Sequence, residues 1–297
     1  MADFNGIVVI NKEKGFTSHD AVNVVRKIFD MRKVGHTGTL DPEATGVLPI
    51  CLGKATRVSD LIMESDKEYI AEMKLGIKTD TQDIWGEVID KSHKKVSQEE
   101  FISAIESFKG EYDQIPPMYS AIKINGKKLY EIARQGKEVE RKPRRVNIHY
   151  IEILDVNEDS ARIKVGCSKG TYIRTLINDM GEKLGTFACM TSLQRTKSGV
   201  FHMEDAYTLD ELKNIKENDH LNKVLYNADY VFSSLDRIDL SHELKERFLN
   251  GAKSTVENVP GRYRVYDLKG DFLGIGYVEV DKKRNVLKTE KNFYVQG

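Results

Sequence analysis

The order of apolar and polar residues predicts alternating strands and helices in the first quarter of the chain. Residues 7–10 are an unbroken apolar run, which is typical of a buried strand. Thr17 can cap a helix whose apolar positions recur at helical spacing as far as Phe29. Residues 69–75 alternate between apolar and polar types and predict a half-buried strand. Residues 35–49 are rich in Gly, Thr and Pro without either period, so we expect a loop there.

The same patterns continue through the rest of the chain and predict an α+β fold with a mixed or antiparallel sheet. The further elements are a helix capped by Ser97 and Glu100, a short helix near residues 129–133, strands near 146–150 and 163–167, and a helix over 173–184 that ends at Gly185.

A change of pattern between Tyr226 and Leu240 indicates a domain boundary. We predict a first domain over residues 1–232 and a small β-rich, barrel-like domain over residues 233–297. A strand of this second domain contains Gly274, and glycines inside strands often mark bulges or the close approach of another backbone.

The composition is that of a globular protein. Of the 297 residues, 40% are apolar and 31% are charged, which is enough for a sizeable core. No apolar run approaches the roughly 18 residues of a membrane span, and the first residues lack the basic and apolar regions of a signal peptide. Cys51, Cys167 and Cys189 are far apart and odd in number, which argues against a disulfide framework and a cysteine-based zinc site. We therefore expect a cytoplasmic protein.

Charge is unevenly distributed although the net charge is zero. Residues 123–145 hold nine Lys and Arg against three Glu, a net charge of +6. Residues 204–246 hold eleven Asp and Glu against five Lys and Arg, a net charge of −6. A neutral chain can therefore present a basic face to a nucleic acid. The plainer alternative is that both runs are solvated surface.

The expected loop over residues 35–49 contains the most informative candidate for chemistry. Asp41 is followed by Pro42, which removes the next amide donor and disfavours a helical conformation at Asp41. The carboxylate is thus presented on a rigid turn, and the three glycines of the stretch allow another chain to approach closely. From these residues alone, a reactive carboxylate and an ordinary Asx turn are both open.

Seven segments, in order along the chain, resemble the TruB family of pseudouridine synthases. Residues 35–42, Gly-His-Thr-Gly-Thr-Leu-Asp-Pro, are similar to its catalytic loop. The other segments are 11–18 (its opening strand and helix), 67–71 (active-site tyrosine), 116–123 and 126–136 (RNA-gripping insertion, about 115–145), 167–176 (active-site arginine) and 193–199 (a substrate-side segment). The C-terminal stretch is more loosely similar to a PUA-type RNA-binding domain.

The resemblance assigns catalytic roles to three residues. Asp41 aligns with the nucleophile, which forms and then releases a covalent intermediate while uracil exchanges its N1 attachment for C5. Arg174 matches the arginine that faces this nucleophile, and a neighbouring cation favours the ionised form of a carboxylate. Tyr69 matches the tyrosine that stacks on the target base. The pattern alone favours a surface position on the helix for Arg174 and a core position on the strand for Tyr69.

A second set of residues is implied to hold RNA. His36 matches the residue that enters the RNA loop and fills the space left by the flipped base. Positions that match the pocket lining or lie in the basic insertion are Lys12, Thr39, Tyr172, Leu193, Arg141, Lys142, Arg144 and Arg145. The last four surround Pro143, which favours an extended segment that can follow a phosphate backbone.

The resemblance implies an isomerase that converts uridine 55 in the T-loop of tRNA to pseudouridine by base flipping. It implies no cofactor and no metal, and the sequence has no P-loop, no dinucleotide-binding glycine motif and no His/Cys cluster with ligand spacing. The expected partner is the T-arm of tRNA, with no membrane, guide RNA or obligate protein partner. An additional tRNA chaperone role is compatible with these expectations.

Three alternatives stay open. A guide-RNA-dependent relative shares the Asp loop, but such relatives lack the stretch 126–136. An RNA-binding protein or chaperone without catalysis would not need the intact set of Asp41, Tyr69 and Arg174. A glycoside-type hydrolase would need a second carboxylate opposite Asp41, and Glu43, although close in sequence, is not assigned that task by any pattern.

Overall fold

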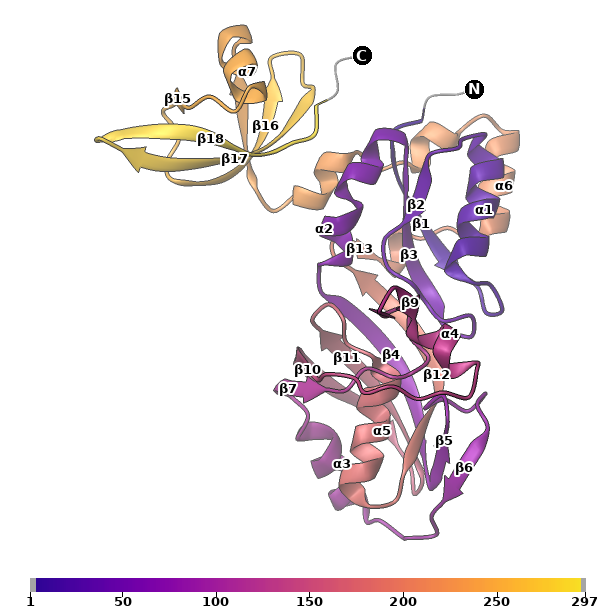
Figure 1. Cartoon of the computed structure of the whole chain (residues 1–297). Coiled ribbons are helices and arrows are strands. Elements are labelled where there is room, and N and C mark those ends of the chain that lie inside the picture. The colour runs from indigo at the N-terminus through magenta and orange to yellow at the C-terminus, as the bar shows by residue number, and fades with distance from the viewer. Residues whose placement is uncertain (1–3, 295–297) are drawn as a thin grey trace.

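A nine-stranded mixed sheet is the central element of the main body (Figure 1). The computed structural model describes residues 4–294, so the extreme N-terminus used for the signal-peptide expectation lies outside the described residues. The strand order is β1-β3-β12-β4-β11-β10-β7, with β2 paired to β3 and β13 paired to β12. The bounds are β1 (Gly6–Lys12), β2 (Val34–His36), β3 (Thr45–Leu52), β4 (Lys67–Leu75), β7 (Gly110–Gln114), β10 (Arg144–Val156), β11 (Ser160–Cys167), β12 (Ala188–Ser198) and β13 (Phe201–His202). Within this sheet, β12 and β3 pair in parallel and the other strand pairs among residues 4–294 are antiparallel, which confirms the mixed sheet.

The expectation of a continuous loop over residues 35–49 is wrong. Residues 45–52 form β3, and β2 ends only at His36. β3 pairs with β1 along its whole length, from Gly6 opposite Leu52 to Lys12 opposite Gly46. The hydrogen bonds of this ladder, made with residues far away in sequence, override the local Gly/Thr/Pro composition. Residues 37–44 are left as the connection, which we call the Asp41 loop.

The expected helices that start near Thr17, Ser97, Leu129 and Ile173 are present. The helix bounds are α1 (Ser18–Phe29), α2 (Ser59–Met63), α3 (Gln98–Glu106), α4 (Leu129–Ala133), α5 (Ile173–Leu184), α6 (Leu209–Glu217) and α7 (His242–Leu249), with 3-10 turns at Gly53–Val58, Met203–Asp205, Leu221–Val224 and Ala228–Phe232. Of these, α6 and α7 carried no prediction from sequence. Thr17 and Asp20 form a capping box at the start of α1. Gly185 ends α5 at φ 65°, a left-handed conformation that glycine adopts without strain.

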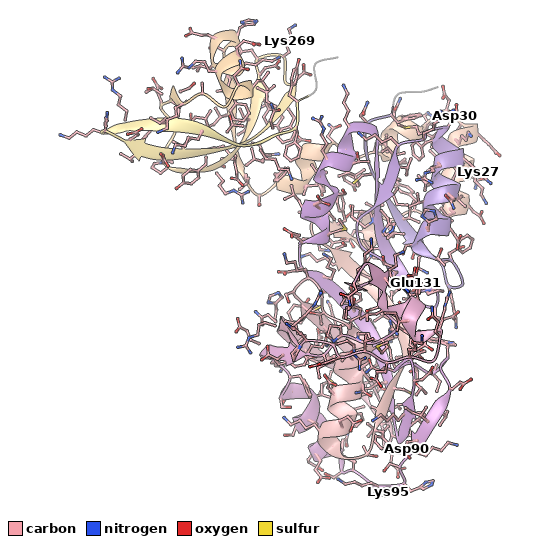
Figure 2. The ribbon with its side chains drawn as sticks, in the orientation of Figure 1. Lys27, Asp30, Asp90, Lys95, Glu131 and Lys269 are labelled. Atoms are coloured by element: carbon pink, nitrogen blue, oxygen red, sulfur yellow. The ribbon has the colours of Figure 1, made fainter. Side chains whose placement is uncertain are left out.

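The core lies between the sheet and the helices that cover it. Buried apolar residues of α1, α5 and the central strands form one continuous cluster. Figure 1 shows α1 and α6 beside one half of the body and α3 and α5 beside the other half. Charged side chains such as Lys27, Asp30 and Lys95 point away from the core, towards the outside of the molecule (Figure 2). Tyr150 is 40% exposed, because a register shift after Ile148 interrupts the alternation of β10.

A separate five-stranded sheet with α7 makes up the C-terminal part (Figure 1). Its order is β14 (Asp236–Leu240), β16 (Gly261–Asp267), β17 (Phe272–Asp281), β18 (Arg284–Asn292) and β15 (Ser254–Thr255). A Cβ at Gly274 would lie 2.1 Å from the carbonyl oxygen of Lys291, which confirms the expected close backbone approach. The predicted boundary at residues 232/233 falls just before β14. Phe232 packs against Phe272 and Phe293 across that boundary, so an apolar cluster joins the two parts.

Two small hairpins complete the body next to the large sheet. One consists of β5 (Ile77–Thr79) and β6 (Val88–Lys91), and the other of β8 (Lys123–Ile124) and β9 (Lys127–Lys128), which precedes α4. The second hairpin and α4 belong to the predicted insertion, residues 115–145, which lies across the middle of the body in Figure 1. The Tyr119 hydroxyl donates to Asp80 at 3.1 Å and ties the insertion to the turn between β5 and β6.

Candidate active site

Residues 37–44, the Asp41 loop, are fastened to the body at several points. The amide of Leu40 donates to the Ser18 hydroxyl at 2.8 Å, at the buried start of α1. Thr37 donates through both its amide and its hydroxyl to the carbonyl of Pro49, each at 3.1 Å. Because these contacts come from α1 and β3, the backbone that carries Asp41 is held in one position.

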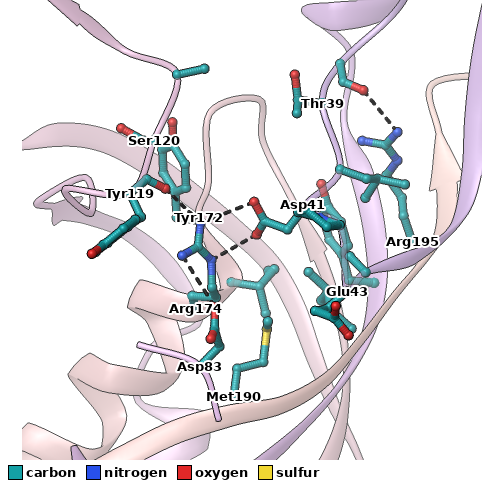
Figure 3. Close-up of a pocket in the computed structure, with 18 of the residues that line it drawn as sticks. Thr39, Asp41, Glu43, Asp83, Tyr119, Ser120, Tyr172, Arg174, Met190 and Arg195 are labelled. Atoms are coloured by element: carbon teal, nitrogen blue, oxygen red, sulfur yellow. Dashed lines mark hydrogen bonds and ion pairs between the residues drawn. The ribbon is translucent and has the colours of Figure 1, made fainter. Parts of the chain in front are cut away.

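Two buried cations hold the same loop from behind. Lys12 is 1% exposed, and its ammonium donates to the carbonyls of Phe16 at 2.7 Å and Pro42 at 3.1 Å. Burial lowers the pKa of Lys12 to about 8. Arg195 is also 1% exposed and donates to the carbonyls of Val47 at 2.7 Å and Gly38 at 3.3 Å (Figure 3). Backbone carbonyls thus compensate part of the desolvation of both charges.

Asp41 faces Arg174 in a two-pronged ion pair (Figure 3). Nε of Arg174 lies 2.9 Å from one carboxylate oxygen, and a terminal nitrogen lies 3.3 Å from the other. The two residues are far apart in sequence and meet because α5 begins beside the Asp41 loop. The Arg174 side chain is 6% exposed, whereas that of Asp41 is 41% exposed. The arginine is therefore fixed, and the carboxylate is open to a molecule in the pocket.

The terminal nitrogens of Arg174 are also engaged. Nη1 donates to the carbonyl of Thr81 at 2.9 Å, and the Nη2 that contacts Asp41 also donates to the carbonyl of Tyr119 at 3.0 Å. A terminal nitrogen lies 3.6 Å from the carboxylate of Asp83, and burial raises the pKa of Asp83. The guanidinium thus connects the Asp41 loop, the turn before β6 and the insertion.

Tyr69 lines the same pocket from β4. It is the direct cross-strand neighbour of Arg195 in β12. Burial raises the pKa of the Tyr69 phenol, an effect that the positive charge of Arg195 opposes. The phenol is neutral near pH 7. A neutral phenol is suited to stacking on a nucleobase and poorly suited to acting as a general base.

The pocket has a volume of about 680 Å³. It brings together six of the residues singled out in the sequence: Asp41, Arg174, Tyr69, Thr39, Tyr172 and Leu193. The pocket is large enough for a nucleotide, and the ion pair of Asp41 and Arg174 is part of its lining.

The comparisons with known proteins agree with this geometry. Residues 26–173 match the model of the N-terminal domain of the TruB family of pseudouridylate synthases. Residues 174–233 match the model of the C-terminal domain of tRNA pseudouridylate synthase B. A protein of Alkaliphilus oremlandii, named tRNA pseudouridine synthase B, is 45% identical over 281 residues, which are 92% of this chain and 93% of that protein.

The chain belongs to the TruB family. A Clostridioides difficile protein that is also named tRNA pseudouridine synthase B is 43% identical over 97% of this chain and 99% of its own length. Among solved structures, a Cbf5-Nop10-Gar1 complex contains a chain with a TM-score of 0.72 and 28% identity, over 97% of this chain and 85% of that chain. An H/ACA RNP bound to a substrate RNA gives a TM-score of 0.71 and 26% identity, over 98% and 85%.

Other residues that the TruB resemblance singles out lie outside the pocket wall. Lys12 lies beneath the Asp41 loop, not at the pocket surface as expected. His36 is partly buried at the end of β2, and burial lowers its pKa. The basic residues of the insertion, Arg141, Lys142, Arg144 and Arg145, are also absent from the pocket lining. Their roles in RNA binding stay predictions.

Two residues of this TruB site carried no prediction from sequence. Asp83 belongs to a polar run after β5, and its contact with Arg174 joins two residues that are far apart in sequence. Arg195 stands inside the segment 193–199, but only Leu193 was singled out there. The sequence signal that could have found it is its spacing: Arg195 stands two residues after Leu193 and shares its face when the segment forms a strand.

Among residues 4–294, no group of His, Cys, Asp and Glu is arranged to hold a metal ion. The three cysteines are buried and unpaired. In the same part of the chain, no helix has the length and apolarity needed to cross a bilayer.

Proposed function

We propose that the protein isomerises uridine to pseudouridine at position 55 in the T-loop of tRNA. The observation that carries this proposal is the ion pair of Asp41 and Arg174, two residues that line a pocket large enough for a nucleotide. The relatives named tRNA pseudouridine synthase B, of which the two described above are 45% and 43% identical, support tRNA as the substrate.

The geometry suits a nucleophilic carboxylate. Asp41 bonds covalently to the target nucleoside, the N1–C1′ bond breaks, and the uracil turns so that C5 joins C1′. The bond to Asp41 then breaks and returns the free carboxylate. The C5 proton is then lost and N1 gains a proton, so the reaction consumes no redox partner or nucleotide. Because Arg174 is held by two backbone carbonyls, it keeps the carboxylate oriented throughout.

The target uracil must leave the base stack of the RNA before Asp41 can reach the nucleoside, because the glycosidic bond of a stacked uridine is enclosed by RNA. The pocket supplies the replacement contacts. Tyr69 and Leu193 offer apolar surface to the flipped base, and Tyr172 lies at the start of α5 next to Arg174. His36 is assigned by the family match to the space that the base leaves in the RNA loop.

The domain division follows from the same proposal. Residues 1–232 carry the catalytic site, with the insertion as an RNA grip. Residues 233–297 act as a PUA-like RNA-binding domain. The tRNA chaperone role stays a prediction.

A guide-RNA-dependent enzyme is the main competing function, because the two Cbf5-type structures described above come from protein and ribonucleoprotein complexes. Their identity to this chain is 28% and 26%, well below that of the proteins named tRNA pseudouridine synthase B. The insertion also contributes to the site itself, since the Tyr119 carbonyl accepts from Arg174. Action on tRNA without a guide is therefore the better-supported function.

A synthetic T-arm hairpin tests this proposal. The purified chain is incubated with the hairpin alone, and pseudouridine is mapped by carbodiimide labelling. We expect conversion at the position that corresponds to uridine 55. A requirement for a guide RNA or a second protein would overturn the proposal. A hairpin with cytidine at the target position is the matched control and should show no labelled site.

A further inference from the structure

Trp85 is the single tryptophan of the sequence, and it is 42% exposed. It lies in the turn between β5 and β6, next to Ile84, which is 38% exposed. Exposed apolar side chains that cluster beside a functional pocket often mark a binding surface. The reaction proposed above gives this indole no task.

The position of Trp85 connects two hollows of the surface. It lines the pocket of Asp41, and it also lines a neighbouring hollow of about 860 Å³. The wall of this second hollow includes Arg134, Lys137 and Arg141 of the insertion. A strand of RNA that leaves the pocket towards the basic insertion therefore passes the indole ring.

The surroundings of the ring suit a nucleic acid better than a protein. The Lys14 ammonium lies 5.0 Å from the centroid of the Trp85 ring, and it also pairs with Glu43 at 3.3 Å. Aromatic side chains flanked by cations are typical of surfaces that bind single-stranded RNA, because bases stack on the ring and phosphates meet the positive charge.

The turn that carries Trp85 is tied to the catalytic arginine. The Trp85 amide donates to one oxygen of Asp83 at 3.2 Å, and the other oxygen of Asp83 lies 3.6 Å from Arg174. The ring is therefore attached to a turn whose position is fixed relative to Asp41. A base stacked on it would set the register of the RNA at the pocket.

We infer that Trp85 is a stacking platform for an unpaired base adjacent to the target uridine. This inference rests on the proposed function and adds a specific contact to it. The indole takes no part in bond breaking. It binds the neighbouring nucleotide while the target base occupies the pocket.

Intrinsic fluorescence tests the inference directly, because the chain has only one tryptophan. The Asp41→Asn variant is titrated with T-arm hairpin, so that binding is observed without turnover. We expect quenching of the Trp85 emission. Hairpins with an abasic site at each position that flanks the target locate the base, and one of them should abolish most of the quenching. Quenching that is the same for every abasic hairpin would overturn the inference.

Substitution of the ring provides the second arm. Trp85→Ala should weaken hairpin binding roughly 5- to 100-fold, as removal of a stacked base does, and Trp85→Phe should restore most of the affinity. The larger part of the effect should appear in Kd, not in the single-turnover rate at saturating RNA. Val88→Ala is the matched control, since Val88 is an exposed apolar residue at the start of β6 and lines neither hollow.

The outcomes separate this inference from the proposed function. If the wild-type protein converts the hairpin but Trp85 emission stays constant on binding, the stacking role is wrong and the proposed function stands. If no conversion occurs, the proposed function itself fails. If emission changes with protein concentration in the absence of RNA, and sedimentation shows a dimer, the exposed ring belongs to a contact between two copies and the inference is overturned.

Discussion

The Asp41 loop and the insertion both carry charged residues, but the two regions hold them in opposite ways. Around the loop, Lys12, Arg174 and Arg195 are buried, and each donates to backbone carbonyls. In the insertion, Arg145 has a 61% exposed side chain and lies near Glu111 and Asp113 at 3.7 and 3.5 Å. The first arrangement fixes geometry, whereas the second leaves charges that RNA can recruit.

This difference has an energetic reason. A buried cation is stable only with good hydrogen-bonding partners, so the protein commits several carbonyls to each one and the site becomes rigid. An exposed ion pair contributes about 0–1 kcal/mol, so it is easily exchanged for a phosphate. Chemistry should therefore depend on the loop region, and affinity and salt dependence on the insertion.

The Arg174→Lys substitution should have the largest effect, and it tests whether chemistry depends on the loop region. An ammonium cannot reproduce the two-pronged contact with Asp41 together with the bonds to Thr81 and Tyr119. We expect the single-turnover rate on a T-arm hairpin to fall by roughly a hundredfold or more, about 3 kcal/mol, with hairpin affinity changed little. Lys169→Arg, an exposed neighbour in the preceding turn, is the control. A near-normal rate would remove Arg174 from the catalytic set.

Arg195→Met tests whether the second buried cation positions the loop. The carbonyls of Val47 and Gly38 lose their donor, which should lower the free energy of unfolding by about 2 kcal/mol. The rate should fall roughly tenfold, about 1.4 kcal/mol, through displacement of Asp41. Urea unfolding and single-turnover kinetics measure the two effects, with Lys197→Met in the same strand as control. Equal stability and rate in variant and wild type would contradict the positioning role.

Replacing Arg141, Lys142, Arg144 and Arg145 with Ser addresses the insertion. Arg141 pairs with Glu138, and Arg145 lies near Glu111 and Asp113, so part of the +6 charge is neutralised in the free protein. If these side chains move to phosphates, affinity for any T-arm sequence should fall roughly tenfold or more. The log–log salt slope should flatten by about one unit for each phosphate that no longer meets a cation.

The rate at saturating RNA in this quadruple variant should hold, because the four residues lie outside the pocket. Lys95→Ser is the control, since Figure 2 shows Lys95 at the end of the body away from Glu131 of the insertion. An unchanged affinity and salt slope in the quadruple variant would make the cluster ordinary solvated surface.

The smallest expected effect concerns Asp179, a partly buried carboxylate that accepts a hydrogen bond from the neutral side chain of Asn178 at 3.3 Å. Burial raises the pKa of Asp179, in the same helix as Arg174, from 3.8 to about 6. The folded state thus holds this proton more tightly than the unfolded state, so stability falls as the pH rises from about 4 to 6. Asp179→Asn should raise the free energy of unfolding by about 1–2 kcal/mol at pH 7.5 and by nothing below pH 4. Urea unfolding at both pH values measures this, and an equal gain at both would contradict the assignment.

Local signals in the sequence predict local structure well. Thr17 with Asp20, Ser97 with Glu100 and Gly185 define helix ends because the groups that satisfy the helix termini are only a few residues away. Residues 45–49 were expected to be part of a loop because the strand that orders them, β1, lies far away in sequence.

The same limit applies to the site. The resemblance located Asp41, Tyr69 and Arg174, and the structure brings all three into one pocket. Asp83 and Arg195 were not predicted from the sequence, because their contacts form only when distant segments meet. Asp83 contacts Arg174 of α5, and Arg195 donates to the carbonyl of Gly38. The ion pairs of Arg145 in the insertion were likewise not predicted, because their partners, Glu111 and Asp113, belong to β7.

The nucleophilic role of Asp41 is the central claim, and single-turnover kinetics of Asp41→Asn test it most directly. Wild-type protein and variant are mixed in excess with a T-arm hairpin that carries tritium at C5 of the target uridine, and release of tritium is followed with time. We predict no release by the variant over many wild-type half-lives, with hairpin affinity within a few-fold of wild type, because the substitution keeps the shape of the side chain and removes its negative charge. Release by the variant at a sizeable fraction of the wild-type rate would contradict the account.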